Sequence, residues 1–252
     1  MTSVDRHRHI TDAVRNSGQL SVAELAELTG TSEMTIRRDL DILAEQGVLE
    51  RYRGGARSLL MRGEEPPFAL RAHDGQQAKQ RIAAAVADML TDGEAVVIDS
   101  GTTCLEVARA LIGRRLTVMP LSLHATNALV GAPQLQLLLP GGEPRPGELA
   151  LTGPLAEASL AALRFDTAVI GCCGLNAANG LTAYDLADAA IKRAMMASAH
   201  RVIAVADASK LSHTALAFVA PASAVHLVVT AEDAPDSETA ALSAAGVVVR
   251  KV

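Results

Sequence analysis

From about residue 79 onward, short apolar runs alternate with stretches of helical periodicity. The expected strands are residues 95–98, 116–119, 135–139, 167–170, 202–206 and 227–230. Most of these runs are rich in valine and isoleucine and are nearly continuous in hydrophobicity, which is typical of parallel strands buried on both faces. The pattern therefore predicts an α/β domain whose largely parallel sheet is covered by helices.

Residues 5–58 follow a different pattern, which predicts three short helices and then a turn-rich hairpin. A capping box formed by Ser21 and Glu24 begins the second helix, and Ser32 caps the third. The second and third helices are joined by a tight turn that contains Gly30, which is a helix-turn-helix arrangement. The residues expected to be buried are Ile10, Ala13 and Val14 in the first helix, Val22, Leu25 and Leu28 in the second, and Ile36, Leu40 and Leu43 in the third.

The other face of the third helix and the hairpin carry the residues expected to contact DNA. A recognition helix meets base edges near its N-terminal half, and arginine can form two hydrogen bonds with guanine. After Gly47, a strand, a turn at Gly54-Gly55 and a returning strand predict a basic wing that touches phosphates or enters the minor groove. The candidate DNA-binding residues are Ser32, Glu33, Thr35, Arg37, Arg38, Arg51, Arg53 and Arg57.

The charge balance requires that any basic surface be local. The chain carries 23 Lys and Arg against 28 Asp and Glu, and residues 1–63 contain nine Arg and nine acidic residues, a balance of zero. A charged helix face that is merely solvated is therefore an alternative to DNA binding. DNA binding requires the arginines to cluster on one side and acids such as Glu24, Glu27 and Glu45 to lie elsewhere.

The two patterns imply a domain boundary. Residues 1–59 form the expected helix-turn-helix domain and residues 78–252 the expected α/β domain. Residues 60–77 between them fit neither periodicity, and the pair Pro66-Pro67 disfavours a helix there. We interpret this segment as a linker.

Ligands of parallel α/β sheets bind at the carboxyl ends of the strands. Residues 99–103, with the sequence DSGTT, follow one expected strand and precede an expected helix over residues 105–112. Glycine allows close backbone approach, and hydroxyls together with the free amides of a helix N-terminus bind anions such as phosphate. Lys210 from another strand end can neutralise the same phosphate, and Lys192 either joins the pocket or pairs with Asp188.

Two groups of motifs resemble the DeoR family of bacterial transcription regulators. The first lies within residues 6–59 and includes TIRRDL at residues 35–40 and RGGA at residues 53–56. The second spans most of residues 67–232 and includes KQRIA at residues 79–83, DSGTT at residues 99–103 and ADASK at residues 206–210. The resemblance implies a small N-terminal winged helix-turn-helix and a larger mostly parallel α/β sensor domain, similar to ribose-phosphate isomerase and CoA transferase.

The resemblance also implies that the sensor domain binds a phosphorylated sugar or a related metabolite. The chain departs from the family where Pro120-Leu121-Ser122 stands in place of two polar groups, and where Cys173 occupies a position that is often acidic. The candidate effector-binding residues are Asp99, Ser100, Gly101, Thr102, Thr103, Gly141, Gly142, Gly171, Gly174, Asp185, Asp188, Lys192 and Lys210.

The expected function is a repressor of a carbohydrate-metabolism operon that binds double-stranded operator DNA as a homodimer or higher homo-oligomer, since paired half-sites need paired recognition helices. The alternative is an isomerase-like enzyme that uses Asp99, Asp185 or Asp188 as acid or base and Lys192 or Lys210 as electrophile. The attached helix-turn-helix favours the regulator, with no catalytic residue and no cofactor.

The remaining signals have simpler explanations. His7 and His9 lack further ligands at metal spacing, so we expect them to be solvated or to touch the DNA backbone. Cys172 and Cys173 are expected to be small buried hydrophobes rather than a redox switch. An odd number of cysteines, a charged N-terminus and the lack of a long apolar run predict a cytoplasmic protein without membrane contact.

Overall fold

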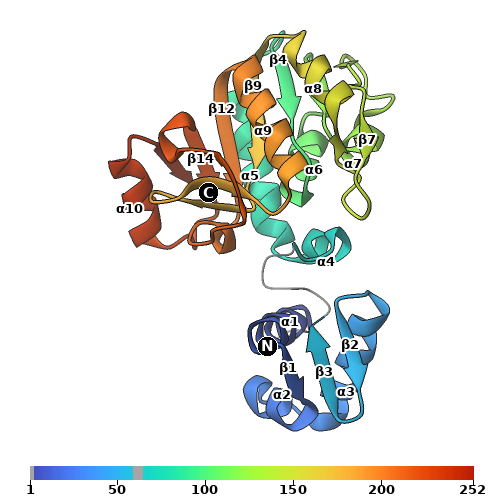
Figure 1. Ribbon diagram of the computed structural model, residues 1–252. Coiled ribbons are helices and arrows are strands. Elements are labelled where there is room, and N and C mark those ends of the chain that lie inside the picture. The colour runs from blue at the N-terminus through green and yellow to red at the C-terminus, as the bar shows by residue number, and fades with distance from the viewer. Residues whose placement is uncertain (1–2, 59–64) are drawn as a thin grey trace. The chain divides into compact units, whose positions relative to one another are not determined.

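The computed structural model describes residues 3–58 and 65–252 (Figure 1). The chain divides into two compact units, Met1–Asp74 and Gly75–Val252. Among the residues that the structure describes, no helix combines the length and the apolar character that a membrane span requires.

The first unit is a helix-turn-helix with a three-stranded antiparallel sheet of order β1-β3-β2. Its helices pack around a buried apolar cluster that includes Ile10, Leu25, Ile36, Leu40 and Leu43, so these expected core positions are confirmed. The elements are α1 (Ser3–Ser17), β1 (Gln19–Ser21), α2 (Val22–Thr29), α3 (Glu33–Glu45), β2 (Leu49–Tyr52), β3 (Gly55–Ser58) and α4 (Phe68–His73).

The capping box at the start of α2 is present as expected, because Ser21 and Glu24 satisfy each other's backbone amides. The expected burial of Leu28 is wrong, since its side chain is 58% exposed. At about 100° per residue, Val22 and Thr29 lie to one side of Leu25 and Leu28 lies about 60° to the other. The buried face of α2 therefore runs through Val22, Leu25 and Thr29.

The wing hairpin turns one residue earlier than expected. Tyr52 pairs with Gly55, so Arg53 and Gly54 form the turn, and Gly54 has a φ of +105° that favours glycine. Gly55 has a different role. A Cβ there would lie 2.3 Å from the carbonyl oxygen of Leu20, so glycine is required for β3 to pack against β1.

The segment expected to be a linker contains a helix in its second half. Helix α4 begins directly after Pro67, because proline is compatible with the start of a helix although it disrupts the interior. Arg71 holds this start by donating from Nε to the carbonyl oxygen of Pro66 at 2.8 Å. The prediction that residues 60–77 lack a helix is therefore wrong for residues 68–73 and for residues 76–77, where the next helix begins, while residues 60–64 lie outside the described residues.

The main sheet of the second unit has seven parallel strands in the order β15-β14-β12-β9-β4-β5-β6. The expected parallel α/β architecture is confirmed, and β15 adds a strand that the pattern did not predict. The strands are β4 (Ala95–Ile98), β5 (Thr117–Pro120), β6 (Gln136–Leu137), β9 (Phe165–Gly171), β12 (Ala199–Ala206), β14 (Leu227–Thr230) and β15 (Val248–Lys251).

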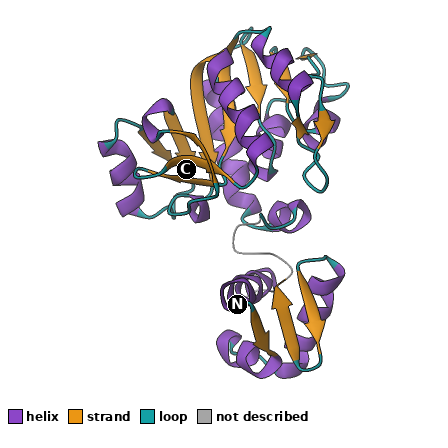
Figure 2. Ribbon diagram, in the orientation of Figure 1, coloured by secondary structure: helices purple, strands orange, loops and turns teal. Residues whose placement is uncertain are grey.

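Helices cover both faces of this sheet (Figure 2). Val97 packs into one apolar cluster with α8, α9 and α10, whereas its neighbours Val96 and Ile98 pack into another with α5, α6 and α7. This alternation follows from the two-residue period of a strand. The helices are α5 (Gln76–Met89), α6 (Thr102–Ala110), α7 (Leu123–Leu129), α8 (Pro154–Ala161), α9 (Leu186–Ser198) and α10 (Asp236–Ala244).

Two small antiparallel sheets lie outside the parallel sheet and were not expected. One has the order β10-β11-β13 and the other pairs β7 with β8. Their strands are β10 (Gly174–Asn176), β11 (Gly180–Ala183), β13 (Ala217–Ala220), β7 (Glu143–Pro144) and β8 (Leu151–Thr152). They are built from the long connections that follow β6, β9 and β12.

The strand order reverses between β4 and β9. From β4 the chain passes to β5 and β6 on one side, and it then returns to place β9, β12, β14 and β15 on the other. Connections leave the sheet in opposite directions at such a switch point, which creates a crevice at the carboxyl ends of the two strands. The DSGTT segment follows β4 and therefore lies at this switch point.

Candidate functional site

A buried ion-pair cluster ties the recognition helix α3 to α1. Asp39 is 4% exposed and accepts hydrogen bonds from Arg6 Nε at 2.5 Å and Arg6 Nη2 at 3.1 Å. The Nε2 atom of His7 lies 2.9 Å from Asp39 Oδ1. The expectation that His7 is solvated or touches DNA is therefore wrong, because its ring faces Asp39. Periodicity missed this cluster, since its partners lie more than 30 residues apart.

The contacts with Arg6 and His7 lower the pKa of Asp39. Burial by itself raises the pKa, but the hydrogen bonds and charges of Arg6 and His7 outweigh it, so the pKa lies below its ordinary value of 3.8. A carboxylate with a lowered folded-state pKa stabilises the fold above its ordinary pKa, and this contribution is lost as the pH falls through the folded-state pKa.

Replacement of Asp39 by asparagine is expected to destabilise α3 by about 1–3 kcal/mol at pH 7, because Arg6 and His7 lose a charged acceptor. The difference between the native protein and the variant should shrink as the pH falls below 3.8. Amide hydrogen exchange of α1 and α3 in the full-length chain measures both effects. Equal protection of the two proteins at pH 7 would contradict a stabilising role for Asp39.

The outer face of α3 combines capping groups with exposed arginines. The Oγ atom of Ser32 accepts the Thr35 amide at 3.2 Å and lies 2.9 Å from Thr35 Oγ1, so both residues shape the helix start. Arg37 pairs with Glu33 at 3.1 Å, one turn earlier. Arg38 is exposed and forms no ion pair with the described residues.

Two of the three wing arginines are also paired with acids. Arg51 on β2 pairs with Asp41 on α3. Arg57 on β3 pairs at 2.7 Å with Glu50, the residue directly opposite on β2. Arg53 lies in the turn and has no acidic partner in the part of the chain that the structure describes. Acids and arginines are therefore interleaved on this surface, which the sequence pattern did not predict.

In the second unit, a buried ion-pair cluster lies at the switch point. Lys192 on α9 pairs with Asp99, which follows β4, and its Nζ lies 3.4 Å from Asp188 Oδ2. Asp99 and Lys192 are only 1% and 2% exposed. Asp99 also accepts the amides of Ser100 at 2.8 Å and Gly171 at 3.0 Å. The carboxylate thus joins the ends of β4 and β9 to α9.

Lys192 attracts both carboxylates of this cluster, while the two carboxylates repel each other. Burial opposes the charged form of Lys192, but the carboxylates of Asp188 and Asp99 raise its pKa well above the ordinary value, so it stays protonated. Burial and the neighbouring Asp188 raise the pKa of Asp99, against the charge of Lys192. The polar atoms of the cluster are directed at one another and at backbone amides. The cluster therefore holds the start of the DSGTT segment in a fixed position relative to β9 and α9.

The hydroxyl groups of the DSGTT segment lack the hydrogen-bond partners that Asp99 has in the described residues. Ser100, Thr102 and Thr103 are largely buried, yet their hydroxyls form no hydrogen bond with the residues that the structure describes. Gly101 has a φ of +98° directly before α6, a conformation that favours glycine. The first turn of a helix leaves its amides without an intrahelical partner. The segment therefore presents free hydroxyls and amides, the groups that bind an anion.

Lys210 lies in a short 3₁₀ helix, η1 (Ala208–Lys210), that follows β12, and β9 separates β12 from β4 in the sheet. Burial raises the pKa of Asp207, but the charge of Lys210, a hydrogen bond from Ser209 and the charge of Lys79 together lower it. Lys79 is buried in the first turn of α5. Sequence reasoning placed Lys79 only in a family motif, although it adds positive charge near the end of β12.

The remaining candidates have structural roles that packing explains. A Cβ at Gly142 would lie 2.6 Å from the carbonyl oxygen of Thr152, and one at Gly141 would lie 2.9 Å from Leu155 Cβ. Both glycines therefore allow their loop to pack closely.

Gly174, Gly171 and Asp185 are likewise accounted for within the fold. A Cβ at Gly174 would lie 2.5 Å from the carbonyl oxygen of His213, and one at Gly171 would lie 3.0 Å from that of Ser100. Asp185 caps α9 by accepting the amide of Asp188 at 2.9 Å. These residues shape the loops and the helix start around the switch point.

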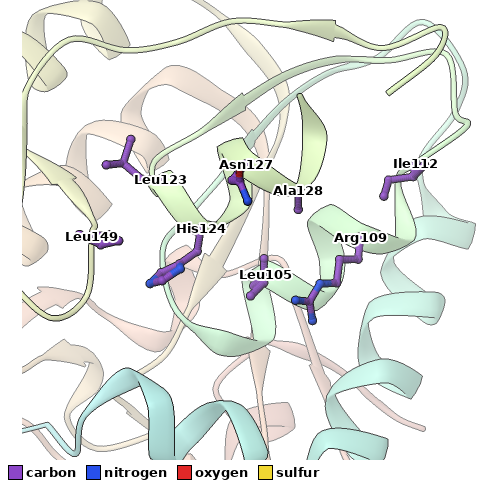
Figure 3. Close-up of a pocket in the computed structure, with 8 residues that line it drawn as sticks. All are labelled: Leu105, Arg109, Ile112, Leu123, His124, Asn127, Ala128 and Leu149. Atoms are coloured by element: carbon purple, nitrogen blue, oxygen red, sulfur yellow. The ribbon is translucent and has the colours of Figure 1, made fainter. Parts of the chain in front are cut away.

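A groove of about 710 Å³ opens between α6 and α7. Figure 3 shows Leu105 and Arg109, which belong to α6, and His124 and Asn127, which belong to α7. The side chains of Arg109 and His124 lie on either side of Leu105. None of residues 99–103 lines it, and it begins at Leu105, about one helical turn beyond Thr102. The groove is therefore adjacent to the DSGTT segment and separate from it. Its lining residues are Leu105, Arg109, Ile112, Leu123, His124, Asn127, Ala128 and Leu149.

The described residues contain no cluster of three or more His, Cys, Asp or Glu side chains that fits a metal ion. Cys104, Cys172 and Cys173 are free thiols, and Cys104 and Cys173 are buried. Burial raises the pKa of Cys172 to about 12, which disfavours the reactive thiolate.

Two family models match the chain. Residues 6–60 match the DeoR-like helix-turn-helix domain, and residues 74–232 match the DeoR C terminal sensor domain. Among solved structures, ribose 5-phosphate isomerase A from Methanocaldococcus jannaschii aligns with 54% of this chain and 55% of its own, with a TM-score of 0.41 and 14% identity. That likeness is too distant to bear on function.

Curated relatives match over nearly the full length. The glycerol-3-phosphate regulon repressor of Escherichia coli (strain K12) is 32% identical over 93% of this chain and 92% of its own. The transcriptional repressor AccR of Agrobacterium fabrum is 34% identical over 90% and 88%. The L-fucose operon activator of Haemophilus influenzae is 31% identical over 92% and 93%. Together with the two domain matches, these similarities show that the chain belongs to the DeoR family of DNA-binding transcription regulators.

Proposed function

We propose that this protein represses a carbohydrate-metabolism operon and that a phosphorylated sugar or related metabolite controls its affinity for operator DNA. The observation that carries the DNA-binding half is the outer face of α3, where Arg37 and Arg38 are exposed at the helical positions that meet base edges. Arg53 at the tip of the wing is placed to contact a phosphate or the minor groove. Ser32 supports this face by capping α3, where its Oγ accepts the amide of Thr35.

The effector half rests on the free groups of the DSGTT segment. We assign the phosphate of the effector to the hydroxyls of Ser100, Thr102 and Thr103 and to the first amides of α6, with Lys210 as the counter-charge. Asp99, Asp188 and Lys192 hold this segment in place and do not contact the effector, because their charged atoms already face one another.

The same pairing argues against the enzyme alternative. A general acid or base must reach the substrate with its titrating group. Asp99, Asp188 and Lys192 are buried in mutual contacts, and Asp185 is used to cap α9. The three candidate acid or base residues and Lys192 therefore have structural roles, and only Lys210 remains available, which supports a sensor that binds its ligand without turning it over.

Control of DNA affinity requires that the effector couple the two domains, here assigned as residues 1–59 and 78–252. A coupling free energy of about 1–3 kcal/mol is typical for such regulators. We propose that the protein acts in the cytoplasm on DNA as a homodimer or higher homo-oligomer, since two half-sites are matched by two recognition helices.

The test has two steps. Duplexes selected from a random-sequence library by the full-length protein identify a preferred site. Binding to that site is then measured with a panel of sugar phosphates, glycerol 3-phosphate, and their dephosphorylated counterparts. The proposal requires a selected site and at least one phosphorylated compound that changes affinity for it while its dephosphorylated counterpart does not. Turnover of a phosphorylated compound would instead favour the enzyme.

Replacement of Lys210 by alanine is expected to leave DNA binding by the ligand-free protein unchanged and to weaken the response to the active phosphorylated compound about tenfold, because one charge-assisted contact is lost. Titration of that compound into the protein bound to its selected duplex measures both quantities. Asp233→Ala, at an exposed position of the same unit, is the control. An unchanged response to the compound would contradict the assignment of Lys210.

A further inference from the structure

The first unit carries no net positive charge, although we assign it to DNA. Its first 63 residues contain nine arginines and nine acidic residues. In the structure, the acids are not confined to a side remote from the arginines. Glu33, Asp41 and Glu50 each pair with one of the arginines proposed to face DNA.

The three pairs come from different parts of the surface. Glu33 is one helical turn before Arg37 on α3, Asp41 joins α3 to Arg51 on β2, and Glu50 faces Arg57 across the wing hairpin. The paired carboxylates are well exposed, with side chains that are 54%, 56% and 46% accessible for Glu33, Asp41 and Glu50. Among the described residues, Arg38 and Arg53 are the arginines on this surface without such a partner.

Pairing an arginine with a carboxylate is expected to weaken binding to non-cognate DNA more than binding to a cognate site. Binding to any duplex depends on how many phosphates the protein neutralises, and a carboxylate beside an arginine reduces that attraction. An exposed ion pair is worth only about 0.2–1 kcal/mol, whereas a bidentate contact between arginine and a base is worth about 1–3 kcal/mol. The correct base can therefore displace the carboxylate, whereas contact with a phosphate only exchanges one anionic partner of the arginine for another.

We propose that Glu33, Asp41 and Glu50 are specificity-determining residues that mask Arg37, Arg51 and Arg57 from non-cognate DNA. This inference rests on the proposed function. A random duplex meets mainly the positive charges of Arg38 and Arg53, while a cognate site also engages the masked arginines. The masking accounts for a DNA-binding unit that has no net positive charge.

The test compares two double variants of the full-length protein that change the net charge equally. Asp41→Asn with Glu50→Gln unmasks Arg51 and Arg57. Glu27→Gln with Glu45→Gln removes two exposed acids that have no cationic partner among the described residues. Affinity for a mixed-sequence duplex is measured over a range of KCl concentrations, and the thermal unfolding of each variant confirms that it is folded.

The unmasked variant is expected to bind the mixed-sequence duplex about tenfold more tightly at low salt, and its plot of log affinity against log salt should steepen by up to about 1.8, or 0.9 per freed arginine. The control variant should change both quantities much less. Equal changes in the two variants, or none in the unmasked one, would overturn the masking, because net charge alone would then explain binding.

Glu33→Gln tests the recognition helix in the same way. It is expected to raise affinity for the mixed-sequence duplex more than affinity for the selected site, so the ratio of the two affinities falls about threefold or more, given the small size of exposed pairs. An unchanged or increased ratio overturns the role of Glu33. If the native protein selects no sequence at all, the proposed function itself fails, and the masking fails with it.

Discussion

Replacement of Arg38 by alanine is expected to weaken binding to the selected site by about 1–3 kcal/mol, the value of one lost base contact. Arg38 is exposed on α3 and, within the described chain, has no carboxylate partner to displace. Arg37→Ala should have a similar effect on the selected site, but a smaller one on mixed-sequence DNA because Glu33 already neutralises Arg37 in part.

The wing arginines provide the matched comparison. Arg53→Ala should weaken binding to all sequences alike and lower the salt slope by about 1, as expected for one lost phosphate contact. Arg51→Ala and Arg57→Ala should lower the slope less, since each is paired with an acid. Fluorescence anisotropy with labelled duplexes at several salt concentrations measures these quantities. Unchanged binding in Arg37→Ala, Arg38→Ala and Arg53→Ala would refute the assignment of this surface to DNA.

Replacement of Lys192 by methionine is expected to destabilise the second unit by about 3–5 kcal/mol, the range for removing one partner of a buried ion pair. The substitution leaves the carboxylates of Asp99 and Asp188 facing each other in a buried site without a cation. Because Asp99 also accepts the amides of Ser100 and Gly171, the DSGTT segment should lose order as well.

Urea unfolding followed by circular dichroism, with hydrogen exchange to assign the transition to the second unit, measures this effect. Lys210→Met is the matched control, because Lys210 is only half-buried. The double variant Asp99→Asn with Lys192→Met should recover part of the lost stability, since the two residues interact directly. A loss of stability in Lys192→Met no larger than in Lys210→Met would show that the cluster does not support the fold.

Local sequence rules accounted for the elements whose determinants lie close together in the chain. The capping box at Ser21 and Glu24 and the cap at Ser32 involve residues three positions apart, and they form as expected. The strand at residues 95–98 was likewise apparent because a buried parallel strand is apolar along its length. The DSGTT segment could be placed at a strand end for the same reason.

The errors arose where a second segment decides the outcome. Leu28 is apolar, but the packing of α1 and α3 around Leu25 determines which side of α2 is buried. The turn of the wing lies at Arg53-Gly54 because Gly55 already belongs to β3, where it pairs with Tyr52 on β2 and with Ser21 on β1. The pairing of β11 with β13 joins residues more than 30 positions apart, which periodicity does not relate.

The amino-acid sequence by itself determined the two domain types, the parallel sheet and the residue types at the carboxyl end of β4, because periodicity, caps and turns act over a few residues. Only the tertiary structure decided which charged side chains pair with one another. It joined Lys192 to Asp99 across 93 positions, Asp39 to Arg6 across 33, and Arg51 to Asp41 between helix and wing. The energy of an ion pair depends on distance and burial in space, and local sequence pattern specifies neither.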